Sequence, residues 1–117
     1  MNHYQRLSLL IATLALAASA QAAEIDLGAC NFTDAPAIAD GTKATQEQMT
    51  ASATAVRGYM GTMQDALACL DEAEKKAGAD ITAEQKAAIT SAYNSGVDKL
   101  NGIAEEYNAQ VRAFKNR

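Results

Sequence analysis

The chain has 117 residues, 10 of them basic and 14 acidic, and its formal net charge is −4 at pH 7. Such a chain lacks the basic patch that binding to a phosphate backbone requires, and anionic lipid head groups repel it. We therefore expect neither nucleic acid nor a membrane surface as a partner. With no tryptophan and two phenylalanines, it has a modest core, which benefits from a covalent cross-link or a protein partner.

The amino terminus has the features of a secretory signal peptide. Arg6 precedes an apolar run over residues 7–18, which is shorter than the roughly 20 residues of a membrane-spanning helix and so disfavours a retained anchor. The small residues Ala20-Gln21-Ala22 offer a signal-peptidase site. We predict a signal peptide over residues 1–22, cleaved near Ala22. The mature chain is then periplasmic or secreted, and its net charge is −5 because the leader takes one arginine and no acid with it.

Residues 23–44 follow as a predicted coil. They show no helical or strand periodicity, and they contain the only proline of the chain, Pro36. Both cysteines, Cys30 and Cys69, lie in the mature part. An even number of cysteines in an exported protein favours a disulfide, so we predict a Cys30 to Cys69 bond.

The coil is long enough to close this bond beside the first predicted helix. The 15 steps from Cys30 to Thr45 reach about 50 Å when extended, whereas the helix from Thr45 to Cys69 is about 36 Å long. We expect the coil to pack on the flank of the helix that carries Cys69, with Phe32 and Ile38 pointing inward.

A lipoprotein is the alternative to the disulfide. Leu27-Gly28-Ala29-Cys30 matches the lipobox that directs acylation of a cysteine, which would tether the chain to a membrane at Cys30. The acidic residues Glu24 and Asp26 stand between the apolar run and this motif, whereas lipoprotein signals normally reach the lipobox directly. The sequence therefore favours the disulfide.

Two long segments carry apolar residues spaced alternately by four and three, which is typical of helices that pack along one stripe. We predict helices over residues 45–77 and 82–115. Each opens with a capping box, at Thr45 and Thr82, and Gly78 ends the first one. The stripes consist of Met49, Ala53, Val56, Met60, Met63, Leu67 and Leu70, and of Ile89, Tyr93, Gly96 or Val97, Leu100, Ile103, Tyr107, Val111 and Phe114.

The short connection between the two segments predicts the fold class. Each helix is about 50 Å long, and only residues 79–81 separate Gly78 from the second cap. Equal lengths and a short connection imply antiparallel neighbours. We predict an all-α domain over residues 45–117, an antiparallel, coiled-coil-like two-helix hairpin with the amino-terminal coil pinned to its first helix.

Folding the chain at this connection pairs positions whose residue numbers sum to 159 or 160. Leu70 then faces Ile89, and large residues face small ones further along, for example Met63 against Gly96, as expected of interdigitating side chains. The run Asn94-Ser95-Gly96 contains three poor helix formers. The sequence leaves open whether the second helix continues through this run or kinks or breaks there.

The sequence offers no chemistry that a catalytic site requires. The only histidine, His3, lies in the leader, which excludes nucleophiles activated by histidine, zinc sites of the usual kind and haem attachment in the mature chain. Two groups of carboxylates, Asp71, Glu72 and Glu74, and Glu105 and Glu106, are expected on solvated faces. We predict no catalytic residue, no metal site and no cofactor.

Two further patterns have a structural and a functional interpretation. Gly58-x-x-Gly61 falls on the outer face of the first helix, where glycine costs about 1 kcal/mol per residue, and it marks either a close helix contact or nothing functional. Met49, Met60 and Met63 resemble a soft binding groove, although core packing is the better interpretation.

The spacing of several residues resembles a family of small exported proteobacterial proteins. The shared features are Pro36 with Ile38-x-Asp40-Gly41, the Cys69-Leu70 pair near the end of the first helix, and the ending from Tyr107-Asn108 to Lys115. The resemblance covers nearly the whole mature chain, and it implies an exported helical protein but no activity. This chain has Thr33-Asp34-Ala35 where the family has a further proline.

Two classes of function agree with these patterns. The first is a non-catalytic interaction protein or accessory subunit, which binds an unknown protein partner or forms a homodimeric four-helix bundle. The second is a carrier of a small apolar ligand, held opposite Gly96 near Met60 and Met63. We do not expect an enzyme.

Overall fold

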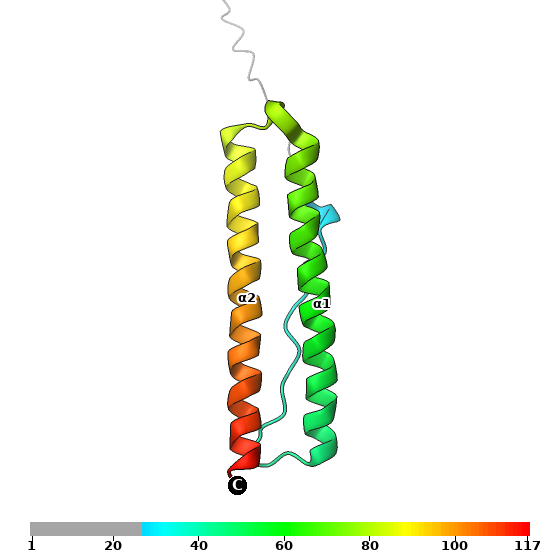
Figure 1. Cartoon of the computed structure of the whole chain (residues 1–117), viewed down its shortest axis with the longest axis vertical. Coiled ribbons are helices and arrows are strands. Elements are labelled where there is room, and N and C mark those ends of the chain that lie inside the picture. Colours follow the sequence, from blue (N-terminus) through cyan, green and yellow to red (C-terminus); the bar gives the residue numbers. More distant parts are fainter. Residues whose placement is uncertain (1–26) are drawn as a thin grey trace, which may run out of the picture.

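The computed structural model describes residues 27–117, and the predicted signal peptide and residues 23–26 lie outside the described residues. A short 3-10 helix, η1 (Leu27–Ala29), is followed by coil and by the long helix α1 (Gln46–Ala77). A second 3-10 turn, η2 (Gly78–Asp80), leads to α2 (Ala83–Lys115). The two long helices lie side by side and antiparallel (Figure 1), which confirms the predicted hairpin.

The helices begin and end where the sequence predicted. At the start of α1 the Thr45 hydroxyl accepts the Gln48 backbone N–H at 3.1 Å, and the Gln48 side chain accepts the Thr45 N–H at 2.9 Å. Thr82 caps α2 in the same way. These bonds satisfy backbone donors that have no partner inside the helix. Gly78 has a positive φ of 57° and donates to the Glu74 carbonyl, so it ends α1 in a conformation that glycine adopts without strain.

The core runs along the seam between the helices. One cluster of buried residues consists of Val56, Tyr59, Met63 and Ile103. Nearer the connection, Cys30, Leu70 and Ile89 form a second cluster. Met63 and Leu70 are fully buried, and the clustering of Leu70 with Ile89 agrees with the predicted pairing.

The second helix is unbroken through Asn94-Ser95-Gly96, which answers the question that the sequence left open. Gly96 is buried, and a Cβ atom added there would lie 2.8 Å from Leu67 and 3.0 Å from Phe32. Tertiary packing against these side chains therefore offsets the low helix propensity. The pairing by residue number had placed Met63 opposite Gly96, but Leu67, one turn further along α1, and Phe32 are its nearest neighbours.

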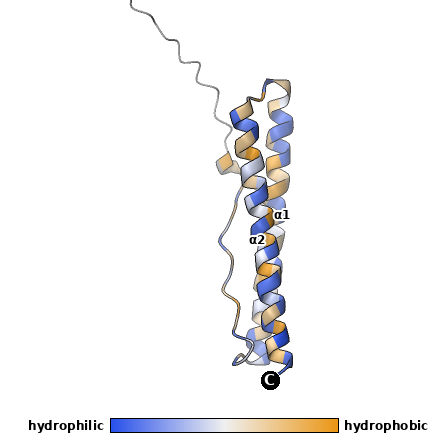
Figure 2. Ribbon diagram, turned by 90° about the vertical axis from the view of Figure 1, so that its left-hand side faces the viewer, coloured by the Kyte–Doolittle hydropathy of each residue, from blue (hydrophilic) through white to orange (hydrophobic). Residues whose placement is uncertain are grey.

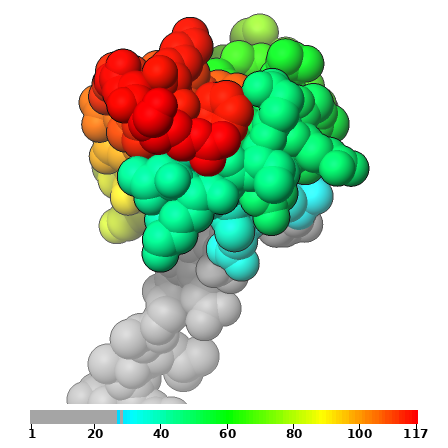
Figure 3. Space-filling model, turned by 90° about the horizontal axis from the view of Figure 1, so that it is seen from below, coloured from blue at the N-terminus to red at the C-terminus, as the bar shows by residue number. Residues whose placement is uncertain are grey.

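The segment of residues 30–44, which we name the strap, runs from the upper part of the hairpin, beside Cys69 near the end of α1, to its base (Figure 1). The turned view shows it along one side of the two helices (Figure 2). At the base, the end of the strap lies against the last turns of α2 (Figure 3). Phe32 and Ile38 are half-buried and pack on the core cluster around Tyr59, which confirms that these side chains point inward.

Candidate functional surface

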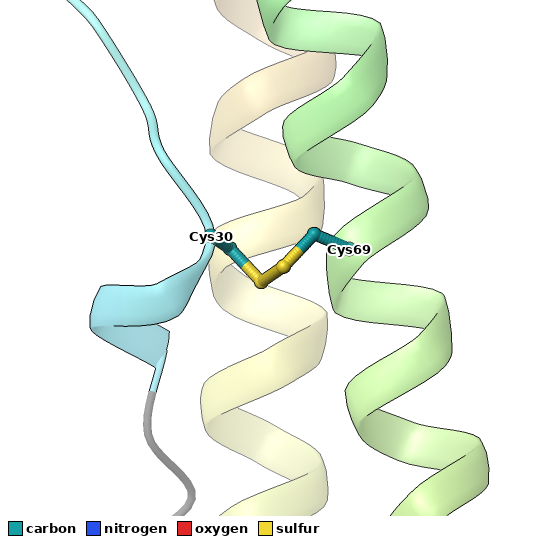
Figure 4. The surroundings of a disulfide bond; sticks show 2 residues. All are labelled: Cys30 and Cys69. Carbon is teal, nitrogen blue, oxygen red and sulfur yellow. A yellow bond between two sulfur atoms is a disulfide. The ribbon is translucent and has the colours of Figure 1, made fainter.

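A disulfide fixes the start of the strap. Cys30 and Cys69 are joined with a Cα to Cα distance of 5.4 Å across 39 positions of sequence (Figure 4). Cys30 is buried and Cys69 half-buried. The predicted bond is confirmed, and the sulfur that acylation at Cys30 would require is occupied by it.

Polar contacts fix the other end of the strap. The Ala39 N–H donates to the buried Ser52 hydroxyl at 2.9 Å, and the Gly41 N–H donates to the Gln110 side-chain carbonyl at 2.8 Å. The Arg117 guanidinium donates to the Ala44 carbonyl. The strap is therefore anchored to both helices, although neither Ser52 nor Gln110 belongs to a pattern that marks this role in the sequence.

The strap approaches α2 most closely at Gly41. A Cβ atom at this position would lie 2.0 Å from the Gln110 backbone oxygen and 2.9 Å from the Phe114 nitrogen. Both atoms belong to the helix backbone and have little freedom to move. Glycine is therefore required here by space, since its φ is not positive.

The turn at the base of the strap is held by one carboxylate. The exposed Asp40 accepts from the Thr42 hydroxyl at 2.7 Å and from the Thr42 N–H at 3.0 Å. Hydrogen bonds to the charged form stabilise it, and these two bonds, with the side-chain bond as the larger cause, lower the pKa of Asp40 below its ordinary value. Both bonds stay within a local turn of three residues, so we assign Asp40 a structural role.

One buried polar atom of the core has no partner. Tyr59 is buried, and its hydroxyl has no hydrogen-bond partner among residues 27–117. Tyr59 follows Ser52 by two turns on the same side of α1. Its place in the core shows that it is a packing residue.

The other residues singled out in the sequence do not form a site. Within residues 27–117, no group of three or more His, Cys, Asp or Glu side chains is placed to hold a metal ion. Glu105 and Glu106 are exposed, and Glu72 pairs with Lys75 at 3.3 Å on the surface.

The methionines and glycines behave largely as packing and surface residues. Met49 and Met63 are buried and Met60 is half-buried, as expected for core packing. A Cβ atom at Gly58 or Gly61 would meet nothing within 4 Å, so no contact within the described chain requires either glycine.

The predicted space for an apolar ligand is filled. Leu67 and Phe32 occupy the position opposite Gly96. A depression of about 650 Å³ does exist, but it is a shallow, open one on the outer surface of α2 between Lys86 and Asp98, lined by small and polar residues of that helix alone. It lacks the apolar enclosure that buries a small ligand.

The side of the hairpin opposite the strap carries an apolar stripe on α2, while on α1 the exposed Arg57 and Gln64 flank Met60. Met60 precedes Cys69 by nine residues, about two and a half turns, so the two side chains leave α1 on opposite sides. On α2, Val97 and Ala104 are turned by on the order of 120–140° from Gln110, which binds the strap. We name this surface the open face, and it consists of Met60, Tyr93, Val97, Ala104 and Val111.

The open face is only partly covered by its neighbours. Four of its residues are half-buried, and Tyr93, 37% exposed, is the one large hydrophobic residue of the described chain that is exposed. Along α2 the stripe continues with spacings of four and three, and its six positions contain no charge: Tyr93, Val97, Leu100, Ala104, Tyr107 and Val111.

Comparisons with known proteins identify no relative. The chain matches no protein-family model, and no curated protein and no solved structure matches it. Among residues 27–117, no helix is both long and apolar enough to cross a bilayer. The function is therefore inferred from the residues and contacts described above.

Proposed function

We propose that the protein is an exported, non-catalytic interaction protein that binds another helical surface through the open face. The observation that supports this most strongly is the difference between the two sides of the seam. The strap covers one side and is bonded to both helices, whereas the open face keeps an uncharged apolar stripe partly exposed to water. Exposed apolar area of this kind marks interaction sites in small proteins.

Export is supported by the sequence and by the disulfide. The amino-terminal run with its signal-peptidase site predicts a cleaved leader, and disulfides form and persist in oxidising compartments. We therefore place the mature protein in the periplasm or outside the cell, in keeping with the exported family that it resembles. The absence of histidine after residue 3 supports a role without catalysis.

The chemistry of the open face defines the partner that it fits. A stripe with spacings of four and three takes the side chains of another helix between its own, and an uncharged stripe favours an apolar partner surface. The partner is accordingly an amphipathic helical protein, packed on the hairpin in the manner of a coiled coil. The carrier alternative lacks comparable support because side chains fill its expected cavity.

Site-specific cross-linking in the native host tests this proposal. A photoreactive phenylalanine at Val97 should capture a protein on illumination, and the same residue at Ser91 should not. Ser91 is exposed on the same helix, about 120° around from Val97. The captured protein is identified by mass, and Val97→Glu should abolish its binding to the unlabelled chain. Equal capture at both positions, or none at Val97, would contradict the proposal.

A further inference from the structure

We infer that the occupant of the open face is a second copy of this chain, packed antiparallel to the first in a four-helix bundle. This inference rests on the proposed function, because it names the partner for the same face. The distribution of charge along the hairpin carries it.

The two halves of the hairpin differ in charge. The tip half, residues 62–98, has seven acidic and three basic side chains, a net charge of −4. The base half, residues 46–61 with 99–117, has three acidic and five basic side chains, a net charge of +2. The strap adds Asp34, Asp40 and Lys43, a net charge of −1. The hairpin is therefore polar along its long axis.

This polarity selects one orientation of two identical copies. In an antiparallel pair, each acidic tip lies against a basic base, and the opposite charges attract across the contact. In a parallel pair, the two tips with −4 each lie together, and like charges placed across an interface cost affinity. Charges are screened beyond about 8 Å at physiological salt, so the preference acts where the copies touch along their length.

The dimensions of the face suit a dimer. A helix of 32 or 33 residues is about 50 Å long, and two adjacent helices are about 20 Å wide. The whole side of the hairpin, including the polar residues that flank the open face, thus offers at most about 1,000 Å² per copy, compared with about 800 Å² per partner in a stable interface of standard size.

Twofold symmetry makes the face sensitive to single changes. In such a dimer each residue of the open face is used twice, once by each copy. One substitution therefore places two altered side chains in the interface. The central residue Val97 gives the largest effect, and the exposed Tyr93 provides a second variant whose side chain contributes less to the monomer.

The first measurement is the mass of the natively processed protein by light scattering and sedimentation over a range of concentrations. We expect a dimer, and a dissociation constant that rises at least about tenfold in Val97→Glu and in Tyr93→Glu, because each change places charges in an apolar contact. Ser91→Glu is the matched control, and it should leave the dissociation constant unchanged. Circular dichroism and intact mass verify that each variant keeps its helices and its disulfide.

The second measurement is the distance between spin labels attached at Lys86→Cys in the two copies. The antiparallel dimer should give about 50 Å, because the axial rise of about 44 Å between Lys86 and Lys115 combines with the lateral separation of the copies, whereas a parallel dimer would give only that lateral separation, about 20–24 Å. When copies labelled at Lys86→Cys are mixed with copies labelled at Lys115→Cys, the antiparallel dimer should also show a short distance between these two labels, because the tip of one copy lies beside the base of the other.

The outcomes separate this inference from the proposed function. A monomer up to millimolar concentration, a short distance between the Lys86→Cys labels, or a dimer unaffected by both open-face variants would overturn the antiparallel dimer. If the protein were a monomer, or the distance between the Lys86→Cys labels were short, and the cross-link at Val97 still captured a different protein, the proposed function would stand without the antiparallel dimer. Capture of the chain itself, together with the long distance, would support both.

Discussion

On one side of the hairpin the strap covers the seam between α1 and α2, whereas on the other side, among residues 27–117, the seam is closed by the side chains of the helices. The covered side is cross-linked at Cys30 and hydrogen-bonded at Ala39 and Gly41. Within the described residues the open side has no such anchors, and it exposes Tyr93. The difference teaches that the described chain fastens a third segment to one side of its small core and leaves an apolar stripe partly exposed on the other.

The largest expected effect follows from removing the covalent anchor of the covered side. Replacing both Cys30 and Cys69 with alanine should lower the free energy of unfolding by about 4 kcal/mol, since the bond closes a ring of 39 positions and restricts the unfolded chain. Urea denaturation followed by circular dichroism measures the change. A reductant should destabilise the native protein similarly and leave the double variant unaffected. An unfolding midpoint of the double variant equal to that of the native protein would show that the disulfide contributes little to stability.

A steric change at the base should have the next largest effect. Gly41→Ala places a methyl group against the α2 backbone at Gln110, and we expect a loss of about 3 kcal/mol through overpacking. Gly58→Ala is the matched control, because nothing lies within 4 Å of its new Cβ atom, and it should stabilise the helix by up to about 1 kcal/mol. Equal effects of the two variants in thermal unfolding would mean that the strap is free to move away from α2.

Removing one polar anchor of the strap should have a smaller effect. Ser52→Ala leaves the half-buried Ala39 N–H without its acceptor, at an expected cost of about 1–2 kcal/mol. Faster hydrogen exchange at the Ala39 amide should accompany the loss. Thr54→Ala serves as the control, since the exposed Thr54 hydroxyl bonds only to its own helix. No change in exchange at Ala39 would argue that the anchor is dispensable.

The hydroxyl of Tyr59 offers a test with the opposite sign. It is buried without a hydrogen-bond partner in the described chain, so Tyr59→Phe removes a group whose burial is unfavourable. We expect the free energy of unfolding to stay the same or rise by up to about 1 kcal/mol. Tyr93→Phe, at the exposed position, should have no effect. A clear loss of stability in Tyr59→Phe would mean that the hydroxyl has a partner in solution.

The smallest expected effect concerns pH and the turn of the strap. The folded-state pKa of Asp40 is lowered by its bonds to Thr42, so the stabilisation that the charged Asp40 gives the folded state is present at neutral pH. This stabilisation is lost as the pH falls below about 4, the pKa of an unfolded aspartate, and then through the lower folded-state pKa. Asp40→Asn should therefore reduce the acid sensitivity of unfolding below about pH 4. An identical pH profile for the variant would exclude this contribution.

The fold was largely predictable from the sequence because its strongest signals are local. Capping boxes at Thr45 and Thr82 and the stop at Gly78 determine both helices from a few adjacent residues each. The path of the strap followed from the positions of Cys30 and Cys69. These features depend on spacing alone, so no knowledge of the tertiary structure was needed to find them.

The surface was less predictable because it depends on a third element. Pairing two helices by residue number placed Met63 opposite Gly96, but Phe32 of the strap enters beside Gly96 and Leu67 packs there. The same pairing placed Tyr93 in the seam, although it is exposed. The contact of Gly41 with Gln110 joins positions 69 residues apart, and no periodic pattern marks such a pair.

The anchors at the base of the strap imply an order of folding. The Gly41 N–H donates to the Gln110 side chain, and the Ala44 carbonyl accepts from the Arg117 guanidinium, which lies 73 positions further along the sequence. These contacts close much longer loops than the turn between α1 and α2 does, and long loops close more slowly. We expect the hairpin to form first and the strap to dock last. Until then, the chain presents apolar surface on both sides of the seam, which makes newly made protein most prone to aggregation before its base is closed.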